Sequence, residues 1–429
     1  MLRVLLPDDP DRAALLARLE RRGAEVLPEV ERDVRAIVEE VRKHGDAAVR
    51  AYTERFEKRT LTHLELARAD WEAQAASVTP AVQASIARAA MRIAQFHAPQ
   101  KAAGYTLEEG GARLELRVQP LERVGLYVPG GTAAYPSSLL MSAIPARVAG
   151  VEEIVVATPP GRDGAVPAST LAAARVAGVH RIVKAGGAQA IAALAYGTAS
   201  VPRVDKIFGP GNIFVALAKQ RVAGVVAIDQ VAGPTETLII ADEGADPELA
   251  AADLLAQAEH DPMASALLLT TSAALAERVR CAIDEQLPRL SRREIIAASL
   301  EANGGIVVVP DLATAVELAN GYAPEHLCLL VRDPWALVES VRNAGGIFLG
   351  EASAEVMGDY VAGPSHVMPT GGTARFASPL NVEEFVKVIS LIGLNERGMR
   401  ELGPAAATLA ECEGLTAHAA AVRRRLQGG

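Results

Sequence analysis

The alternation of short β-branched runs with alanine-rich segments constrains the fold of this chain more than any other feature of its sequence. Four runs, each mostly apolar at its centre as buried parallel strands are, span 124–128, 153–157, 181–184 and 204–208. Alanine-rich segments at 137–148, 168–176, 188–195 and 212–222 follow these runs and predict helices. Strands that alternate with helices predict a parallel sheet covered on both faces, which is a doubly wound domain.

A second series of the same kind follows, with predicted strands at 237–241, 266–270, 305–309, 327–331 and 346–349. Apolar residues at helical spacing through 33–56 predict helix before the first series, and the chain turns helical again after Gly371-Gly372. The predicted fold class is α/β: two tandem doubly wound Rossmann-like domains with an N-terminal helical segment and a C-terminal helical tail. The expected boundaries are 1–118, 119–236, 237–372 and 373–429, with a ligand cleft between the α/β domains.

Length and charge exclude several classes of function. The 429 residues exceed what one hydrophobic core usually supports, which agrees with two domains. The net charge of -9 argues against nucleic acid as a partner, because no basic excess is available to neutralise phosphates. No apolar run approaches the roughly 20 residues of a membrane helix. The start breaks at Pro7 and two aspartates before a signal-peptide core could form, so we expect a cytoplasmic protein without a membrane partner.

Four of the eight histidines lie in dense polar strings in the C-terminal half of the chain. Histidine is both a metal ligand and a proton carrier near neutral pH, so these strings together predict a metal-centred acid/base site. The strings are Gln257-Ala-Glu-His260-Asp261, Pro324-Glu325-His326, Asp359-Tyr360 with Ser365-His366, and Glu413-Gly-Leu-Thr-Ala-His418.

Gln257 and His260 are three residues apart near the end of a predicted helix, which places them on one helical face before Pro262 ends it. Alone, such a pair is more often a solvated face than a metal site. Asp359 lies among glycine and proline residues that predict a tight loop, which could aim Asp359 and His366 inward. The alternative for this loop is an Asx turn with a surface histidine.

His418 follows Glu413 by five residues, so the two would not share a face of a continuous helix, and Gly414 is expected to open a turn between them. Two nitrogen and two oxygen ligands suited to zinc, with positions left for substrate, are provided together by Gln257, His260, Asp359 and His418.

Glu325 and His326 are adjacent and follow Pro324. Adjacent residues of a strand face opposite ways, so both can enter one site only at a loop or a strand end. One interpretation is an acid/base pair, in which the carboxylate deprotonates water and the imidazole accepts an alcohol proton. The other, of equal weight on the sequence, is a strand with one of the two residues exposed.

The Gly-x-Gly-x-x-Gly fingerprint of nicotinamide cofactors is absent. Three glycine turns, each between a predicted strand and helix of the first domain, could approach a phosphate through their backbone amides. Glycine is also what any tight turn of this kind uses, so the turns alone do not decide for NAD. They are Pro129-Gly130-Gly131, Gly186-Gly187-Ala188-Gln189 and Gly209-Pro210-Gly211-Asn212.

In this order, the strings resemble the histidinol dehydrogenase family, zinc-dependent enzymes that complete histidine biosynthesis. Thr235 stands where the family more commonly has serine, and Met368 where leucine is usual. The resemblance runs from residue 120 to the end of the chain and rests on Gly125-Leu-Tyr-Val-Pro-Gly-Gly131, Val204-Asp-Lys-Ile-Phe-Gly-Pro-Gly-Asn212, Ala232-Gly-Pro-Thr-Glu236, Gln257-Ala-Glu-His-Asp261, Ala323-Pro-Glu-His-Leu327, Gly358-Asp-Tyr with His366-Val-Met-Pro-Thr370, and Glu413-Gly-Leu with His418.

The resemblance implies roles for individual residues. It implies one zinc ion per subunit, which orients histidinol and is bound by Gln257, His260, Asp359 and His418. It implies that these four residues also contact substrate, together with Thr235, Glu325, His326, His366 and Glu413. It implies that NAD lies on the side of the first α/β domain, where it is contacted by Tyr127, Gln189 and Asn212.

The implied reaction is the four-electron oxidation of L-histidinol to L-histidine through an enzyme-held L-histidinaldehyde, with two NAD consumed per turnover. His326 is expected to act as base in both hydride transfers, and Glu325 to activate the water that hydrates the aldehyde. The family is an intertwined homodimer in which the C-terminal tail crosses to the other subunit. Glu413 and His418 are therefore expected to complete the site of the partner.

Two rivals fit part of the sequence. A zinc hydrolase using Glu325 and a metal-bound water fits the ligand set and the missing fingerprint, but gives two α/β domains with glycine turns no purpose. A catalytically dead relative acting as a dimeric binding protein is disfavoured by the intact ligand set and the intact Glu-His pair.

Overall fold

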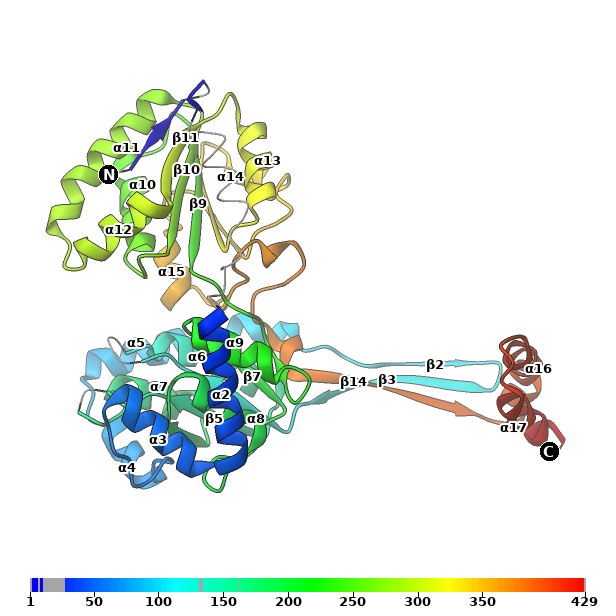
Figure 1. Ribbon diagram of the computed structural model, residues 1–429. Coiled ribbons are helices and arrows are strands. Elements are labelled where there is room, and N and C mark those ends of the chain that lie inside the picture. Colours follow the sequence, from blue (N-terminus) through cyan, green and yellow to red (C-terminus); the bar gives the residue numbers. More distant parts are fainter. Residues whose placement is uncertain (1, 7, 11–27, 131–133, 162, 428–429) are drawn as a thin grey trace.

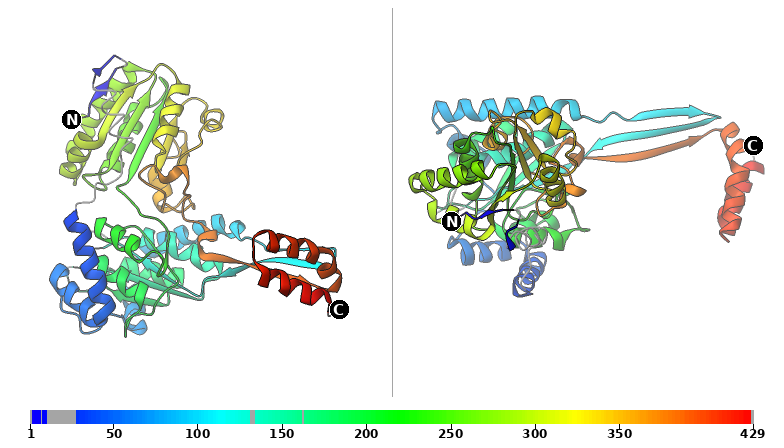
Figure 2. Two further views of the ribbon diagram at one scale, coloured as in Figure 1. Left: turned by 45° about the vertical axis from the view of Figure 1, so that its right-hand side comes forward. Right: turned by 90° about the horizontal axis from the view of Figure 1, so that it is seen from above.

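The computed structural model describes residues 2–6, 8–10, 28–130, 134–161 and 163–427. The chain forms two α/β lobes and an arm that projects from one of them and ends in two helices (Figure 1). The arm stays extended away from both lobes when the molecule is seen from above (Figure 2).

The first lobe is built on a five-stranded parallel sheet of order β6-β5-β4-β7-β8. Its strands are β4 (Arg123–Tyr127), β5 (Glu153–Thr158), β6 (Arg181–Lys184), β7 (Lys206–Phe208) and β8 (Ala227–Ile228). One face is covered by α2 (Pro28–His44), α3 (Asp46–Glu57), α8 (Gly187–Tyr196) and α9 (Ile213–Val222). The other is covered by α4 (Arg68–Ala75), α5 (Pro80–His97), α6 (Pro136–Ala149) and α7 (Ala168–Ala177).

The small side chains of the alanine-rich helices let the first lobe pack closely. Every residue of α8 from Ala188 to Ala195 is buried, because the helix lies between the sheet and the N-terminal helices. The strands are apolar throughout their centres because both faces of the sheet are covered. Each run predicted to be a strand of this domain overlaps one of the observed strands.

The second lobe is built on a six-stranded parallel sheet of order β1-β11-β10-β9-β12-β13. Its strands are β1 (Val4–Leu5), β9 (Glu236–Ala241), β10 (Ser265–Thr270), β11 (Gly304–Val308), β12 (His326–Leu330) and β13 (Gly346–Leu349). One face is covered by α10 (Pro247–Ala258), α11 (Ala273–Gln286) and α12 (Arg293–Asn303), and the other by α13 (Leu312–Tyr322) and α14 (Pro334–Val338). The short helix α15 (Glu355–Tyr360) lies on the side that faces the first lobe (Figure 1).

The chain begins in the second lobe, not in the first. Strand β1 pairs in parallel with β11, with Val4 opposite Ile306. Two residues are too few to show a strand period, so no sequence pattern predicts this strand. Residues 11–27, which belong to the predicted N-terminal helical segment, lie outside the described residues; helix α2 then opens the first lobe.

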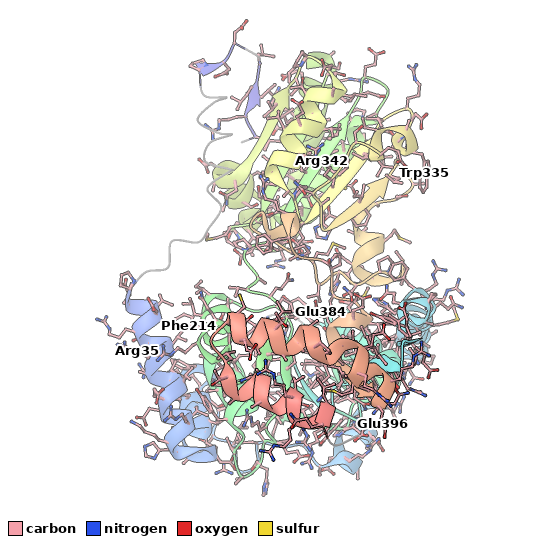
Figure 3. All side chains as sticks on the ribbon, turned by 90° about the vertical axis from the view of Figure 1, so that its right-hand side faces the viewer. Arg35, Phe214, Trp335, Arg342, Glu384 and Glu396 are labelled. Atoms are coloured by element: carbon pink, nitrogen blue, oxygen red, sulfur yellow. The ribbon has the colours of Figure 1, made fainter. Side chains whose placement is uncertain are left out.

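The arm is a three-stranded antiparallel sheet of β2 (Tyr105–Glu109), β3 (Ala112–Pro120) and β14 (Val386–Leu394), in the order β14-β3-β2. Strand β14 pairs with β3 along its whole length, from Val386 opposite Pro120 to Leu394 opposite Ala112. At the base of the arm, Lys206 Nζ of β7 forms an ion pair with Glu384, which lies just before β14 (Figure 3).

Helices α16 (Glu396–Cys412) and α17 (Thr416–Gln427) form a hairpin at the far end of the arm (Figure 1). Gly414 lies between them with φ 75°, so it opens the turn that the sequence predicted. Apolar side chains of the arm and hairpin are exposed, among them Ile392 at 76 % and Leu409 at 64 %. Such a concentration of exposed apolar residues marks a contact surface.

The predicted fold class is confirmed, because two parallel α/β units are flanked by helical regions at both ends of the chain. The structure adds what the prediction lacked, since β1, β2 and β3 lie within residues 1–118 apart from the last two residues of β3, and β14 lies within residues 373–429. Short 3₁₀ turns complete the chain at Ala98–Gln100, Leu287–Arg289, Thr373–Arg375 and Val382–Phe385. Among the described residues, no helix has both the length and the apolar character needed to cross a membrane.

Candidate active site

The segment between β8 and β9 joins opposite edges of the two sheets. Strand β8 ends at Ile228 and β9 begins at Glu236, so residues 229–235 lead directly from the carboxyl edge of the first sheet to the amino edge of the second. Because the strands within each sheet are parallel, neighbouring strands of the first sheet end at the same carboxyl edge, and neighbouring strands of the second sheet begin at the same amino edge. The predicted acid/base residues lie at the amino edge, which departs from the usual rule that ligands bind at the carboxyl ends of such strands.

Glu325 and His326 lie where the chain enters β12, which is the strand end that the sequence interpretation required. Both are buried, at 7 % and 4 % exposure, so the alternative of an exposed residue on a strand does not hold. The Glu325 carboxylate accepts a hydrogen bond from the Thr235 hydroxyl at 2.5 Å and one from the Glu236 amide at 3.0 Å, both at Oε2. Burial raises the pKa of Glu325 to about 7, although His326 and the two hydrogen bonds oppose the shift.

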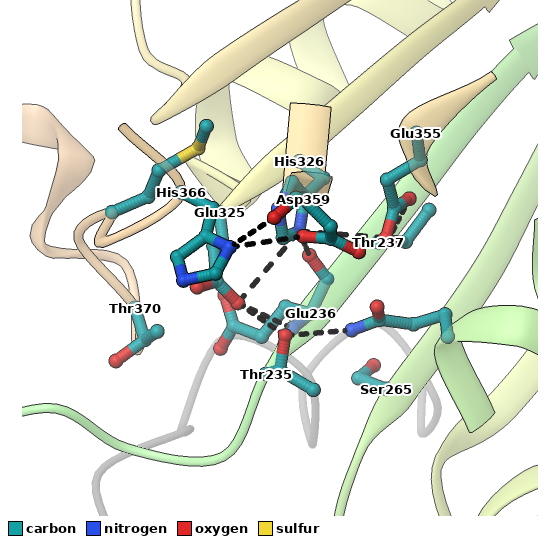
Figure 4. A network of polar contacts seen from close by, with 12 residues as sticks. Thr235, Glu236, Thr237, Ser265, Glu325, His326, Glu355, Asp359, His366 and Thr370 are labelled. Carbon is teal, nitrogen blue, oxygen red and sulfur yellow. Dashed lines mark hydrogen bonds and ion pairs between the residues drawn. The ribbon is translucent and has the colours of Figure 1, made fainter. Parts of the chain in front are cut away.

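The His326 ring lies within a network of polar side chains (Figure 4). Nδ1 lies 3.3 Å from the Glu236 backbone carbonyl, 3.8 Å from Glu325 Oε2 and 3.7 Å from Glu355 Oε1. A carbonyl can only accept, so this contact places the ring hydrogen on Nδ1. Nε2 is buried and makes no hydrogen bond with any described residue. The ring therefore keeps a lone pair available for a substrate proton.

Gln257 lies in the last turn of α10 and is fully buried. Its amide nitrogen donates to the Thr235 hydroxyl oxygen at 3.0 Å, and Thr235 in turn donates to Glu325. The amide oxygen of Gln257 is buried and has no hydrogen-bond partner among the described residues. A buried carbonyl oxygen without a donor is costly, so this atom is suited to hold a cation.

His260 lies beyond the end of α10 at Ala258, so the prediction that one helical face carries both Gln257 and His260 is wrong. The turn has a local reason, because the His260 amide donates to the Gln257 carbonyl at 3.3 Å. Desolvation by surrounding protein lowers the pKa of His260, and the charge of nearby Asp359 opposes this shift. The charge of Asp359 thus acts on His260, which is an exposed residue.

Asp359 lies in the short helix α15 and not in the predicted tight loop, which begins after it. The loop returns His366 to this helix, where His366 Nδ1 lies 2.9 Å from the Asp359 backbone carbonyl. His366 Nε2 lies 3.3 Å from the Ser138 hydroxyl of α6, so this ring joins the two lobes. Desolvation lowers the pKa of His366, and the charge of Asp359 opposes this shift.

Two polar residues of the site carried no sequence signal. Glu355 is 3 % exposed, accepts a hydrogen bond from the Thr237 hydroxyl at 2.5 Å and lies beside His326. Burial raises its pKa well above the usual range. Ser138 lies in α6, more than two hundred residues before His366 in the chain, and its hydroxyl contacts the His366 ring. Neither belongs to a recognisable motif, so only the folded structure identifies them.

Glu413 and His418 are not brought to the other predicted ligands within one chain. Both lie in the hairpin of α16 and α17 at the far end of the arm (Figure 1). They line a groove of about 720 Å³ between the two helices, together with Leu409, Leu415 and Val422. Within the described part of the chain, no three His, Cys, Asp or Glu side chains lie close enough to hold a metal ion. A ligand set that uses His418 is therefore incomplete in a single protomer.

The residues expected to contact NAD lie at the carboxyl edge of the first sheet. Tyr127 ends β4, and its hydroxyl accepts a hydrogen bond from the Gly187 amide at 3.1 Å. Gln189 lies in the first turn of α8, 1 % exposed, with a buried amide oxygen that has no partner among the described residues. Asn212 caps α9 by accepting from the Val215 amide at 3.2 Å and is itself exposed.

Fold and site together define a class of protein: an α/β enzyme with two Rossmann-like lobes and a buried acid/base pair between them. Comparisons with known proteins agree with this class. A sequence model of histidinol dehydrogenase matches residues 20–426.

Histidinol dehydrogenase from Deinococcus radiodurans is 53% identical over 418 residues, which are 96% of this chain and 94% of that protein. The enzyme from Syntrophotalea carbinolica is 52% identical and covers 100% of both chains. The crystal structure of histidinol dehydrogenase from Elizabethkingia anophelis superposes with a TM-score of 0.93 at 35% identity, covering 99% of this chain and 98% of that one. The chain belongs to the histidinol dehydrogenase family and is an oxidoreductase.

Proposed function

We propose that this protein oxidises L-histidinol to L-histidine in two NAD-linked steps through a histidinaldehyde that stays bound. The observation that carries the proposal is the buried Glu325–His326 pair, which offers a carboxyl group with a pKa near neutrality and an imidazole nitrogen free to accept a proton. The relatives' names supply the substrate. As a biosynthetic oxidoreductase, the protein is proposed to act in the cytoplasm.

The residues fit a zinc ion. Gln257 offers a buried amide oxygen without a donor, and His260 is close enough to Asp359 for the charge of Asp359 to act on its imidazole. We propose that these three residues and His418 of a second protomer hold zinc, one ion per subunit. Zinc bound there would act as a template that orients the imidazole and amino nitrogens of histidinol. Thr235 supports this set indirectly, because its hydroxyl fixes the Gln257 amide.

His326 acts as base in both oxidations. Its Nε2 accepts the proton of the alcohol as hydride leaves the carbon for NAD, and the imidazolium so formed is stabilised by the Glu236 carbonyl and the nearby carboxyl groups. The ring must release this proton before the second step. It then accepts a proton from the aldehyde hydrate as the second hydride leaves.

Glu325 supplies the water chemistry between the two oxidations. Its carboxylate takes a proton from water while the oxygen adds to the aldehyde carbon, which gives the hydrate. A carboxylate with an ordinary pKa would be a weaker base toward water, so the burial that raises this pKa serves the step. Enclosure also holds a reactive aldehyde away from solvent nucleophiles. His366 and Glu413 are proposed substrate contacts.

NAD is proposed to lie at the carboxyl edge of the first sheet, against Tyr127, Gln189 and Asn212. The buried amide oxygen of Gln189 and the exposed cap at Asn212 give this edge polar groups for a ligand. Residues 229–235 join this edge directly to the amino edge of the second sheet, which supports a cofactor position near the acid/base pair. Two NAD molecules are used in succession for each histidinol.

We propose a homodimer in which the arm carries Glu413 and His418 into the partner's site. The exposed apolar residues of β14 and α16 and the groove beside His418 supply the contact surface. Mixed dimers test this proposal. Chains carrying Glu325→Gln and chains carrying His418→Ala should each form histidine only slowly when tested alone. Each mixed dimer refolded from the two should contain one intact site, and should therefore form histidine at about half of the parent rate per dimer. No recovery at any mixing ratio would refute the crossing.

The function itself is tested with purified protein, zinc, histidinol and NAD, by following reduced nicotinamide and histidine together. Both products should appear, and removal of zinc by a chelator should stop them until zinc is returned. Hydrolysis of esters or amides without nicotinamide reduction would instead favour the zinc hydrolase. Membership of an oxidoreductase family stands against that alternative.

A further inference from the structure

A buried ion pair lies outside the acid/base site, in the lobe proposed to bind NAD. It joins Lys219, in the last turn of α9, to Asp229, the residue that follows β8. The two side chains are 2 % and 6 % exposed. Burying two charges carries a large desolvation cost, and apolar residues of similar volume often serve stability equally well. The pair therefore calls for an explanation beyond stability.

Both charged groups hold the same residue of the turn between β7 and α9. The Gly209 amide donates to Asp229 Oδ2 at 2.8 Å, and Lys219 Nζ donates to the Gly209 carbonyl at 3.0 Å. Both polar groups of one peptide residue are thus fixed by side chains that also neutralise each other. This turn, Gly209-Pro210-Gly211-Asn212, leads to the proposed NAD contact at Asn212.

Only glycine fits at position 209. Its φ is 112°, and a Cβ atom there would lie 2.1 Å from the Tyr127 carbonyl oxygen. The turn is consequently pressed against the end of β4, beside a second proposed NAD contact. The ion pair and the close approach of Gly209 to Tyr127 together fix the position of the turn at the carboxyl edge of the sheet.

The residues after Asp229 connect this segment to the loop that carries His366, a proposed substrate contact. Gln230 Nε2 donates to the Met368 carbonyl at 2.7 Å, and the Gly233 amide donates to the Thr370 hydroxyl at 2.7 Å. Met368 and Thr370 belong to the loop that carries His366. One short segment therefore holds the NAD turn at Asp229 and the substrate loop at Gln230.

We infer that Lys219 and Asp229 are positioning residues that set the Gly209 turn, and the NAD bound against it, in register with the substrate loop. The inference rests on the proposed NAD site. Hydride transfer needs the two reacting carbons held in contact, and a misplacement of about 1 Å costs on the order of 100-fold in rate. A rigid connection between the cofactor turn and the substrate loop meets this need.

The test replaces the pair in two ways. Lys219→Met with Asp229→Leu keeps the buried volume and removes every hydrogen bond to Gly209. Lys219→Met with Asp229→Asn removes the charges and keeps an amide oxygen that can accept from the Gly209 amide. Single variants would leave an unpaired buried charge and unfold more easily, so the double variants are used. Arg123→Met, which breaks an ion pair at the opposite edge of the same sheet, is the matched control.

Four quantities are measured for each protein: the unfolding temperature, the Kd for NAD by calorimetry, the Kd for histidinol with zinc, and kcat/KM for NAD. In the Met/Leu variant we expect kcat/KM for NAD to fall at least tenfold and the Kd for NAD to rise, with histidinol binding within twofold of the parent. The Met/Asn variant should recover most of the loss, and Arg123→Met should match the parent.

Unchanged NAD parameters in a folded Met/Leu variant would overturn the inference. A Met/Leu variant that weakens NAD and histidinol binding alike and also lowers the unfolding temperature would overturn it too, because these losses would show that the pair has only a structural role. A parent protein that binds NAD but does not oxidise histidinol would overturn the proposed function alone, and the calorimetric comparison would still decide the role of the pair.

Discussion

Replacing Glu325 with glutamine should separate the two oxidations. Both hydrogen bonds that Glu325 accepts, from Thr235 and from the Glu236 amide, end on the same oxygen, so the oxygen of a glutamine can accept both. The side chain keeps its place and its volume. What the glutamine lacks is the ability to take a proton from water.

The size of the effect follows from this loss. A positioned general base contributes about 10²–10⁴-fold, so aldehyde hydration and the second oxidation should slow by about 3–5 kcal/mol in activation free energy. The first oxidation uses Nε2 of His326, whereas the nitrogen near Glu325 is Nδ1. We therefore expect the first oxidation to change by less than about tenfold.

The assay is a single-turnover reaction with Glu325→Gln, histidinol and excess NAD, followed by nicotinamide absorbance with a carbonyl trap present. We expect one fast equivalent of reduced nicotinamide, a trapped aldehyde and a slow second equivalent. Supplying histidinaldehyde directly should give only the slow phase. Equal slowing of both phases, or an unaffected second phase, would refute the assignment of Glu325.

Three further predictions follow from the same residues. His326→Ala should slow both oxidations by about 10²–10⁴-fold in single-turnover kinetics, and a defect confined to one step would contradict its role as shared base. Because burial raises the pKa of Glu325 from 4.5 to about 7, the parent should lose up to about 3 kcal/mol of stability as pH rises through that interval, and Glu325→Gln should lose less in urea unfolding. Gln257→Ala should lower zinc content in metal analysis, and unchanged zinc content would remove Gln257 from the ligand set.

The core strands could be predicted because burial on both faces leaves a mark in the sequence. β10 reads Ser-Ala-Leu-Leu-Leu-Thr and is buried throughout, and such a run has few alternatives. The arm lacks that mark, because every residue of β2 is exposed and no alternation separates an inner face from an outer one. Its partner β14 lies far along the chain, and pairing at that distance leaves no local signal.

The site residues likewise divide into those whose surroundings the sequence predicts and those whose surroundings it does not. For Glu325 and His326 the sequence left two alternatives, a strand end with both residues in the site or a strand with one residue exposed. The burial of both side chains at the entrance of β12 decides for the first. The sequence predicts a loop at Asp359, because a helix of six residues is too short to show a helical period. Contacts such as His366 with Ser138, and the place of Glu355, arise only when the two lobes and the helices close on each other.

The central claim, that one buried pair carries two successive oxidations of one substrate, is tested most directly by a stoichiometric count. A limiting amount of histidinol is converted to completion with zinc and excess NAD, and reduced nicotinamide and histidine are measured in the same sample. The account predicts two equivalents of reduced nicotinamide for each histidine, without free aldehyde. One equivalent with accumulating aldehyde, or no reduction at all, would contradict it.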